Sequence, residues 1–252
     1  MRAWHSTLLD RYEFRHGFAV RTGGVSSPPY DTLNLGFHLG DDEKAVAENR
    51  ARFAQALELS GDRLFEQRQV HGTIVREISS GDHVSTISDI EGDGLIARVA
   101  GYGVAARTAD CVPVLIADPP SGQVAAVHAG WRGSVAGVVS VAIEALAHDP
   151  SGLIVAIGPH IRVGAFEIGE EVAVEMERAA GSSAVVDRTH AKPHGNLAAL
   201  IHHQLRLAGV ADDAIDDVGG CTSSDAAHFF SHRRDGGQTG RHLSAIVARE
   251  AG

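Results

Sequence analysis

The fold is decided by two apolar runs, Val112-Pro-Val-Leu-Ile-Ala117 and Gln123-Val-Ala-Ala-Val-His-Ala129, which are joined by the turn cluster Asp118-Pro-Pro-Ser-Gly122. Short apolar and β-branched runs on either side of a Pro/Ser/Gly turn are typical of two paired strands. The stretch therefore predicts a buried β-hairpin at the centre of the chain.

This hairpin brings a cysteine and a histidine onto one face. If the turn is centred on Pro120-Ser121, Pro113 faces His128 in the neighbouring strand. Cys111 lies two residues from Pro113 and therefore shares the face of His128 as a diagonal neighbour. Diagonal neighbours lie roughly 7–8 Å apart at Cα and closer at their side chains. One ion can bridge two side chains placed in this way.

Strand-like and helical patterns alternate along the rest of the chain without a strict strand–helix–strand rhythm. Apolar residues at helical spacing predict helices over 41–57, 133–147, 167–179 and 196–208. Short apolar runs predict strands over 70–78, 94–97, 103–106, 153–157 and 243–248. The pattern predicts an α/β (α+β) fold, in which mixed β-sheets are flanked by helices, in a single domain over residues 1–252.

Composition excludes several classes of protein. The 22 Lys+Arg and 32 Asp+Glu give a net charge of −10, and no basic block is present, so a nucleic-acid partner is not expected. The hydrophobic fraction of 44% can build a core, which excludes a disordered chain. Two cysteines exclude a disulfide framework and favour a reducing compartment. The absence of a long uninterrupted apolar stretch predicts a cytoplasmic, soluble protein with no membrane partner.

Three short motifs carry the candidate chemistry: Gln69-Val-His-Gly72, Thr108-Ala-Asp-Cys111 and Val127-His-Ala-Gly-Trp-Arg-Gly133. Two imidazoles and one thiolate suit Zn²⁺, and three protein ligands leave a fourth position open for water or substrate. The same atoms also allow a metal-free interpretation, in which Cys111 is a thiolate nucleophile and His128 its base. Spacing alone leaves both interpretations open. Of the 15 histidines, only His228 and His232 form another possible ligand pair, and the Phe229-Phe230 between them favours a loop over a helix.

These motifs closely resemble those of the YfiH/laccase-domain family, once labelled multi-copper polyphenol oxidoreductase, and the resemblance runs over nearly the whole chain. The residues that carry it include Arg21-Thr-Gly-Gly-Val-Ser26, Thr32-Leu-Asn-Leu-Gly36, Val46-Ala-Glu-Asn-Arg50, Gln69-Val-His-Gly72, Thr108-Ala-Asp-Cys111, His128-Ala-Gly-Trp-Arg-Gly133, Ile157-Gly-Pro159 and Phe229-Phe-Ser-His-Arg-Arg-Asp235. One departure is His232, because the family often carries Tyr there, and the exchange removes a phenol.

The resemblance implies a sandwich fold similar to the catalytic domain of cytotoxic necrotizing factors. It also implies one zinc ion, held by the residues that stand here as His71, Cys111 and His128, which would form the catalytic centre. The implied activity is a zinc-dependent purine nucleoside phosphorylase that acts on adenosine, inosine, guanosine and methylthioadenosine, with an adenosine deaminase activity. Its partners would be purine nucleosides and phosphate, and the protein would be a monomer or a homodimer.

Two alternative functions remain. A bacterial branch of the family is assigned to the removal of wrongly incorporated serine from a peptidoglycan precursor, so the chain would then be a cytoplasmic hydrolase. The older family label implies a copper polyphenol oxidase. Copper is less favoured than zinc, because a blue-copper centre usually has an axial methionine and both Met1 and Met176 lie far in sequence from the cluster.

Phosphate recognition calls for arginine, whose planar fork matches a phosphate in a bidentate way. We expect Arg50 and Arg132 to bind phosphate, with Arg21 behind them, and Asn34 to contact ribose or phosphate. Asp110 is a candidate for orienting an imidazole, although strand alternation points it to the face opposite Cys111.

Overall fold

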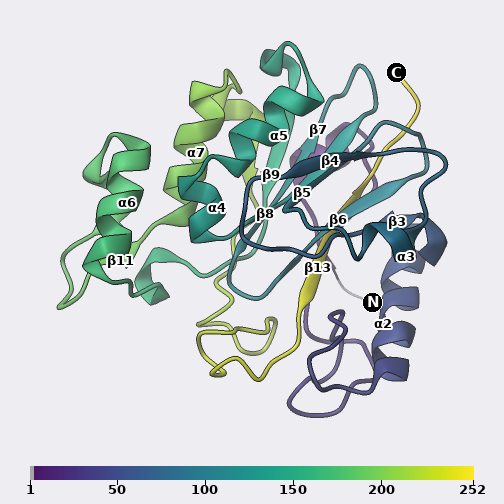
Figure 1. Ribbon diagram of the computed structural model, residues 1–252, viewed down its shortest axis with the longest axis horizontal. Helices are drawn as coiled ribbons and strands as arrows, with labels where there is room; N and C mark the ends of the chain where they lie inside the picture. Colours follow the sequence, from purple (N-terminus) through teal and green to yellow (C-terminus); the bar gives the residue numbers. More distant parts are fainter. Residues whose placement is uncertain (1–2) are drawn as a thin grey trace.

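Two β-sheets face each other at the centre of the structure, a computed structural model that describes residues 3–252 (Figure 1). The five-stranded sheet contains, in spatial order, β1 (Ala3–Trp4), β2 (His16–Ala19), β13 (His242–Val247), β6 (Gly103–Thr108) and β3 (Leu64–Phe65). The six-stranded sheet contains β12 (Ile215–Asp217), β9 (Ile154–Ile157), β7 (Val112–Ala117), β8 (Val124–Ala129), β5 (Gly94–Ala97) and β4 (Val75–Ile78). Both sheets combine parallel and antiparallel pairs, and β10 (Val186–Asp187) and β11 (His194–Gly195) form a small separate ribbon.

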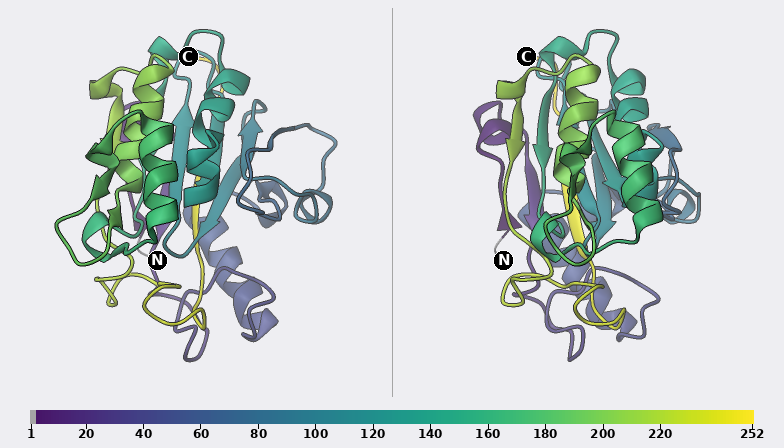
Figure 2. Two further views of the ribbon diagram at one scale, coloured as in Figure 1. Left: turned by 60° about the vertical axis from the view of Figure 1, so that its left-hand side comes forward. Right: turned by 90° about the vertical axis from the view of Figure 1, so that its left-hand side faces the viewer.

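Helices cover the outer face of each sheet. The six-stranded sheet is covered by α4 (Trp131–Val135), α5 (Val138–Leu146), α6 (Glu170–Ala180) and α7 (Leu197–Leu207), and the green and teal helices of Figure 2 lie in front of its strands. The five-stranded sheet is covered by α2 (Glu43–Ala56), on the side away from them. Shorter elements complete the chain: α1 (Thr7–Arg11), α3 (Val84–Ile87) and the 3₁₀ turns η1 (Gly61–Arg63), η2 (Pro150–Gly152), η3 (Val163–Ala165), η4 (Ser183–Val185) and η5 (Asp212–Ala214).

Side-chain alternation along the strands builds three apolar layers. On β7, Val114 packs towards the helices, whereas Leu115 packs into the space between the sheets. On β13, Ile246 enters that same space, and Ala245 packs outwards against α2. Because every central strand is buried on both faces, the strands read as nearly continuous apolar runs. The predicted fold of mixed sheets flanked by helices is confirmed. The expected likeness to cytotoxic necrotizing factors stays a prediction.

The central hairpin has the predicted register, with Pro113 opposite His128. Two segments differ from their predictions. The helix predicted over 133–147 starts earlier, at Trp131, and breaks into α4 and α5 at Gly137, which adopts a left-handed φ of 85°. The strand predicted over 70–78 begins only at Val75, because residues 70–72 wrap around a buried carboxylate instead.

Loops from both ends of the chain cover one end of the sandwich. Figures 1 and 2 show the C-terminal loop in yellow beside the N-terminal loop in purple. The two are joined where the Arg21 backbone N–H donates to His228 O, and where the Leu35 N–H donates to Arg241 O. Residues 3–252 include no helix that is both long enough and apolar enough to cross a membrane.

Buried neutral histidines make this fold sensitive to acid. His242 is 4% exposed, its Nε2 accepts the Phe230 N–H at 2.8 Å, and burial lowers its pKa from 6.5 to about 3. Burial likewise lowers the pKa of His160. Because the unfolded chain takes up these protons first, stability is fully present above about pH 6.5 and is lost as the pH falls towards the folded pKa, by about 1.4 kcal/mol per pH unit for each group.

We predict that the free energy of unfolding falls between pH 7 and pH 5, and that His242→Gln reduces this fall by up to one proton's contribution. The glutamine carbonyl can still accept the Phe230 N–H but does not titrate. Denaturant unfolding of both proteins at several pH values measures the difference. If the free energy of unfolding fell equally steeply with pH in the two proteins, His242 would not contribute to the acid sensitivity.

Candidate functional site

His71, Cys111 and His128 meet at the covered end of the sandwich. His128 lies near the end of β8, Cys111 directly precedes β7, and His71 lies in the loop before β4. The Cys111 Sγ is 3.9 Å from His71 Nε2, and ligand atoms of the three side chains all lie within 4.8 Å of one another. The two imidazole rings are 4.8 Å apart at an angle of 83°. The three residues therefore form a candidate metal site.

Asp93, which directly precedes β5, positions two of these three groups. Its side chain is fully buried, and its Oδ1 accepts hydrogen bonds from His128 Nδ1 at 2.8 Å and from the His71 backbone N–H at 2.9 Å. Its Oδ2 accepts the N–H groups of Gly72 and Val70. Because a carboxylate only accepts, Nδ1 of His128 must carry a proton, which leaves Nε2 as the ring nitrogen that can bind a metal.

The backbone at His71 and Gly130 is adapted to this cluster. His71 has a left-handed φ of 60°, which lets three successive N–H groups converge on the Asp93 carboxylate. Gly130 follows β8, and a Cβ at this position would lie 2.7 Å from the His71 ring and 3.1 Å from the Cys111 Sγ. A larger residue at 130 would therefore displace two of the three candidate ligands.

Charge favours the ligating form of the thiol. Burial alone would raise the pKa of Cys111, but the charge and hydrogen bonds of His128 and His71 outweigh it and lower the pKa to about 6. Burial alone would lower the pKa of His128, but Cys111 and Asp93 raise it to about 9. A nucleophile needs only one imidazole as its base, whereas His71 supplies a second one at the sulfur. The geometry therefore favours the metal interpretation over the metal-free one.

A cavity of about 430 Å³ opens onto the three residues. This volume is within the range of small-molecule sites. Its remaining lining comprises Leu39, Gln69, Arg107, Thr108, Ala109, Asp110, Ile161, Phe166, His232, Arg233 and Arg241. The lining combines an apolar part with three arginines, and Asp110 is its one carboxylate within the described residues.

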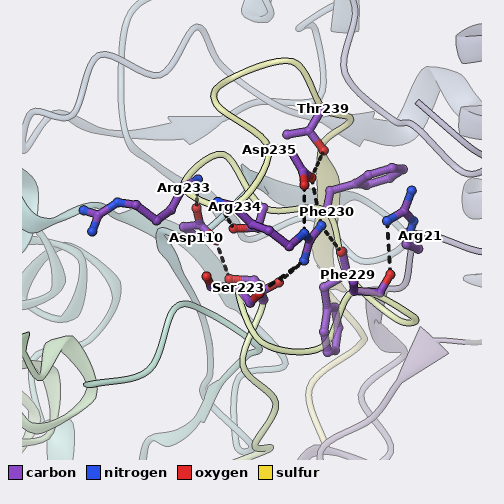
Figure 3. A network of polar contacts seen from close by, with 12 residues as sticks. Arg21, Asp110, Ser223, Phe229, Phe230, Arg233, Arg234, Asp235 and Thr239 are labelled. Carbon is purple, nitrogen blue, oxygen red and sulfur yellow. Dashed lines mark hydrogen bonds and ion pairs between the residues drawn. The ribbon is translucent and has the colours of Figure 1, made fainter. Parts of the chain in front are cut away.

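Asp110 anchors the C-terminal loop and does not orient an imidazole. Its Oδ1 accepts the Thr222 hydroxyl at 2.6 Å, and its Oδ2 accepts the Arg233 backbone N–H at 2.7 Å (Figure 3). This placement agrees with strand alternation and corrects the expected role. In the same loop, Arg234 pairs with Asp235 and donates to the Phe229 carbonyl, so these contacts cross-link residues 229–235 within the loop.

The lining of this cavity does not include Asn34, Arg50 or Arg132, and their expected substrate and phosphate contacts stay a prediction. Asn34 is fully buried, and its Oδ1 accepts the Gly36 and Arg241 N–H groups. Arg50 donates to Leu35 O at 2.8 Å and forms an ion pair with buried Glu66 at 2.9 Å. The Arg132 guanidinium stacks 4.3 Å from the centre of the Trp131 ring.

The secondary candidates are also placed. Arg21 donates to Asp31 O and Ala226 O, so it ties loops together. His228 Nδ1 contacts Asp225, whereas His232 lines the cavity, so these two histidines do not form a ligand pair. The sequence prediction missed Asp93, Arg107, Arg233 and Arg241. For Asp93 the only local signal is an acid between two glycines, Gly92-Asp-Gly94, directly before an apolar strand.

Comparison with known proteins finds similarity over most of the chain. The family described as "Multi-copper polyphenol oxidoreductase laccase" matches residues 15–249. The chain is 39% identical over 234 residues to "Purine nucleoside phosphorylase" of Deinococcus radiodurans. This alignment covers 92% of this chain and 88% of that protein. It is 38% identical over 233 residues to "Purine nucleoside phosphorylase YfiH" of Escherichia coli. This alignment covers 90% of this chain and 91% of that protein.

Solved structures show the same fold. YlmD from Geobacillus stearothermophilus superposes with a TM-score of 0.90 at 33% identity and covers 99% of this chain and 97% of its own. YfiH from Bacillus licheniformis superposes with a TM-score of 0.86 at 28% identity and covers 92% of each chain.

We predict that Asp93→Asn weakens metal binding by about 10- to 100-fold, the range typical for loss of such an outer partner. An amide offers one acceptor oxygen, and its NH₂ group would face backbone N–H donors. Competition with a chromogenic chelator measures the affinity, and circular dichroism checks that the variant is folded. Asp89→Asn, a surface exchange close to the same strand, is the matched control. Unchanged affinity in Asp93→Asn would show that the carboxylate does not position the ligands.

Proposed function

We propose that this chain, which belongs to the multi-copper polyphenol oxidoreductase laccase family, is a metal-dependent purine nucleoside phosphorylase. One structural observation carries the proposal: a cavity of nucleoside size brings an N/S metal-ligand set together with both an apolar lining and unneutralised arginines. Such a cavity can hold a neutral heterocycle and an oxyanion at the same time. The names of the relatives support the same reaction.

We infer that the metal is zinc and that His71, Cys111 and His128 hold it. Two imidazole nitrogens and one thiolate suit zinc, and a site with three protein ligands keeps a position open for substrate. Two features fit a bound ion. The carboxylate of Asp93 orients His128, and the missing side chain at Gly130 leaves room for His71 and Cys111 to converge on one point. When bound, zinc would supply Lewis acidity and orientation to the substrate.

Phosphorolysis joins a phosphate oxygen to the anomeric carbon of the ribose and breaks the bond from that carbon to the purine nitrogen. The purine leaves with the electron pair of the broken bond. In the described lining, Asp110 is the only carboxyl group, and it accepts hydrogen bonds from Thr222 and Arg233, so it is not free to protonate the leaving group. Phe166 and Ile161 of the same lining offer apolar surface for the purine.

The alternative functions have weaker support. A multicopper oxidase needs several metal centres. Within residues 3–252, the other His/Asp cluster is that of His5, Asp10 and His16. Both ring nitrogens of His16 are already bonded, to the Ser6 N–H and to Phe14 O. A blue-copper centre would also use an axial methionine. Met176, in α6, is buried in the apolar core, and Met1 lies outside the described residues. Neither the names of the relatives nor the cavity lining favours a peptidoglycan precursor as substrate.

We predict that the zinc-loaded protein converts inosine and phosphate to hypoxanthine and ribose 1-phosphate. Cys111→Ala should abolish both zinc binding and turnover, because the thiolate is one of only three candidate ligands. Chromatography of the products and metal analysis give the two readouts. Cys221→Ala is the control and should retain zinc and turnover. Full turnover in Cys111→Ala would refute the assigned ligand set, and no hypoxanthine from the parent protein would refute the function.

Deamination of adenosine can be tested in the same preparation. We propose that the site also exchanges the adenine amino group for water, which would release ammonia and form inosine. The reaction is run without phosphate, so that phosphorolysis cannot consume the product. Inosine formed by the parent protein and lost in Cys111→Ala would support the proposal. Phosphorolysis without any deamination would restrict the enzyme to the first reaction.

A further inference from the structure

We propose that Arg107, Arg233 and Arg241 form the orthophosphate subsite of the cavity, beside His71, Cys111 and His128. The inference rests on the proposed phosphorylase function and adds to it the residues that take the second substrate. All three arginines line the same cavity as the candidate metal ligands. They come from distant parts of the chain and meet only in the folded protein.

Arg107 is held through its main chain at the end of β6. Its backbone N–H donates to Gln69 Oε1, and its backbone carbonyl accepts from Gln69 Nε2, both at 2.7 Å. Within residues 3–252, the nearest carboxylate oxygen to its guanidinium is that of Glu66, at 3.7 Å. The same oxygen lies 2.9 Å from Arg50. One carboxylate is therefore shared by two guanidinium groups and lies closer to Arg50, so it compensates the Arg107 charge only in part.

Arg241 is held by a residue that the sequence had suggested as a substrate contact. Its backbone N–H donates to Oδ1 of buried Asn34 at 2.9 Å. Its Nη1 donates to the carbonyls of Thr239 and Gly240. An arginine has five N–H donors, so Nε and Nη2 remain for a ligand. Asn34 thus acts as a positioning residue for Arg241.

Arg233 completes the group from the C-terminal loop. Its backbone N–H is fixed to Asp110, and its side chain extends away from the Arg234–Asp235 network (Figure 3). One guanidinium nitrogen donates to Glu167 O at 2.8 Å, and the guanidinium carbon lies 5.3 Å from the centre of the Phe166 ring. No carboxylate of the described chain forms an ion pair with Arg233 or with Arg241, although the protein as a whole carries a net charge of −10.

This arrangement has an electrostatic cost that an anion would relieve. Arg241 is partly buried, and burial together with the charge of Arg107 lowers its pKa. Two guanidinium groups that repel each other beside a cavity attract an oxyanion between them. A nucleoside is neutral and gives no reason for such a cluster, whereas orthophosphate offers oxygens that match the guanidinium fork. Arg50 and Arg132 lack this role because their guanidiniums are occupied by Glu66 and Trp131.

The test compares Arg107→Gln and Arg241→Gln with the parent enzyme in phosphorolysis of inosine. Each exchange removes charge-assisted hydrogen bonds to phosphate, so we expect the KM for phosphate to rise on the order of 10- to 100-fold. The KM for inosine and the zinc content should stay close to the parent values. Arg241→Lys keeps the charge but loses the fork, so it should fall between parent and Arg241→Gln.

Two controls separate this effect from a general one. Arg206→Gln removes an exposed arginine that pairs with Asp212 at the end of α7, and it should leave both KM values unchanged. Arg132→Gln tests the position favoured by sequence alone. A larger rise in the KM for phosphate in Arg132→Gln than in Arg241→Gln would overturn the assignment. Thermal unfolding identifies any variant that does not fold, and Arg233→Gln then replaces that variant.

Direct binding of inorganic phosphate distinguishes this inference from the proposed function. Titration calorimetry on the zinc-loaded protein needs no turnover. Binding by the parent and its loss in the arginine variants would support the subsite even if no nucleoside were cleaved, in which case only the phosphorylase proposal would fail. Active parent enzyme whose three arginine variants all keep the parent affinity for phosphate would overturn the subsite and leave the phosphorylase proposal intact.

Discussion

The site depends on one buried carboxylate. Asp93 accepts three backbone N–H groups of residues 70–72 and the imidazole N–H of His128, so a single side chain fixes a loop and a strand against each other. A fully buried carboxylate is stable only when such donors surround it, and here they hold its pKa below the usual value in spite of burial. The left-handed turn at His71, the late start of β4 and the orientation of His128, whose Nε2 faces Cys111, all accompany this contact.

The sequence predicted the features that local patterns determine. Turn chemistry and alternation placed Pro113 opposite His128, which correctly put Cys111 on the same face. Helices α2, α6 and α7 were found because their apolar faces recur at helical spacing. Strand β2 (His16–Ala19) was not predicted, because it is short and contains a histidine and a glycine, and only pairing with β13 makes it a strand.

The arginines show where local patterns stop being informative. Arg50 lies in a motif that carries the family resemblance and was expected to bind phosphate, but the fold brings Glu66 to its guanidinium, and the two form an ion pair. Arg241 had no such motif and lies in the cavity because Asn34 and the start of β13 fix its main chain. Whether an arginine is free depends on contacts between distant segments, which neither spacing nor composition encodes. Asn34 was expected to contact ribose or phosphate, and the structure shows that it fixes the main chain of Arg241 at the cavity.

The position of β13 has a consequence for synthesis on the ribosome. This strand lies between β2 and β6 in the five-stranded sheet, although it follows both of them by a long stretch of chain. Until residues 241–247 have left the exit tunnel, β2 and β6 have no central partner and expose their unpaired edges. Arg241 also arrives only then, although His71, Cys111 and His128 have long been translated. A nascent chain could therefore meet metal before the cavity exists, and its six-stranded sheet must stay soluble until β13 completes the five-stranded sheet that covers it.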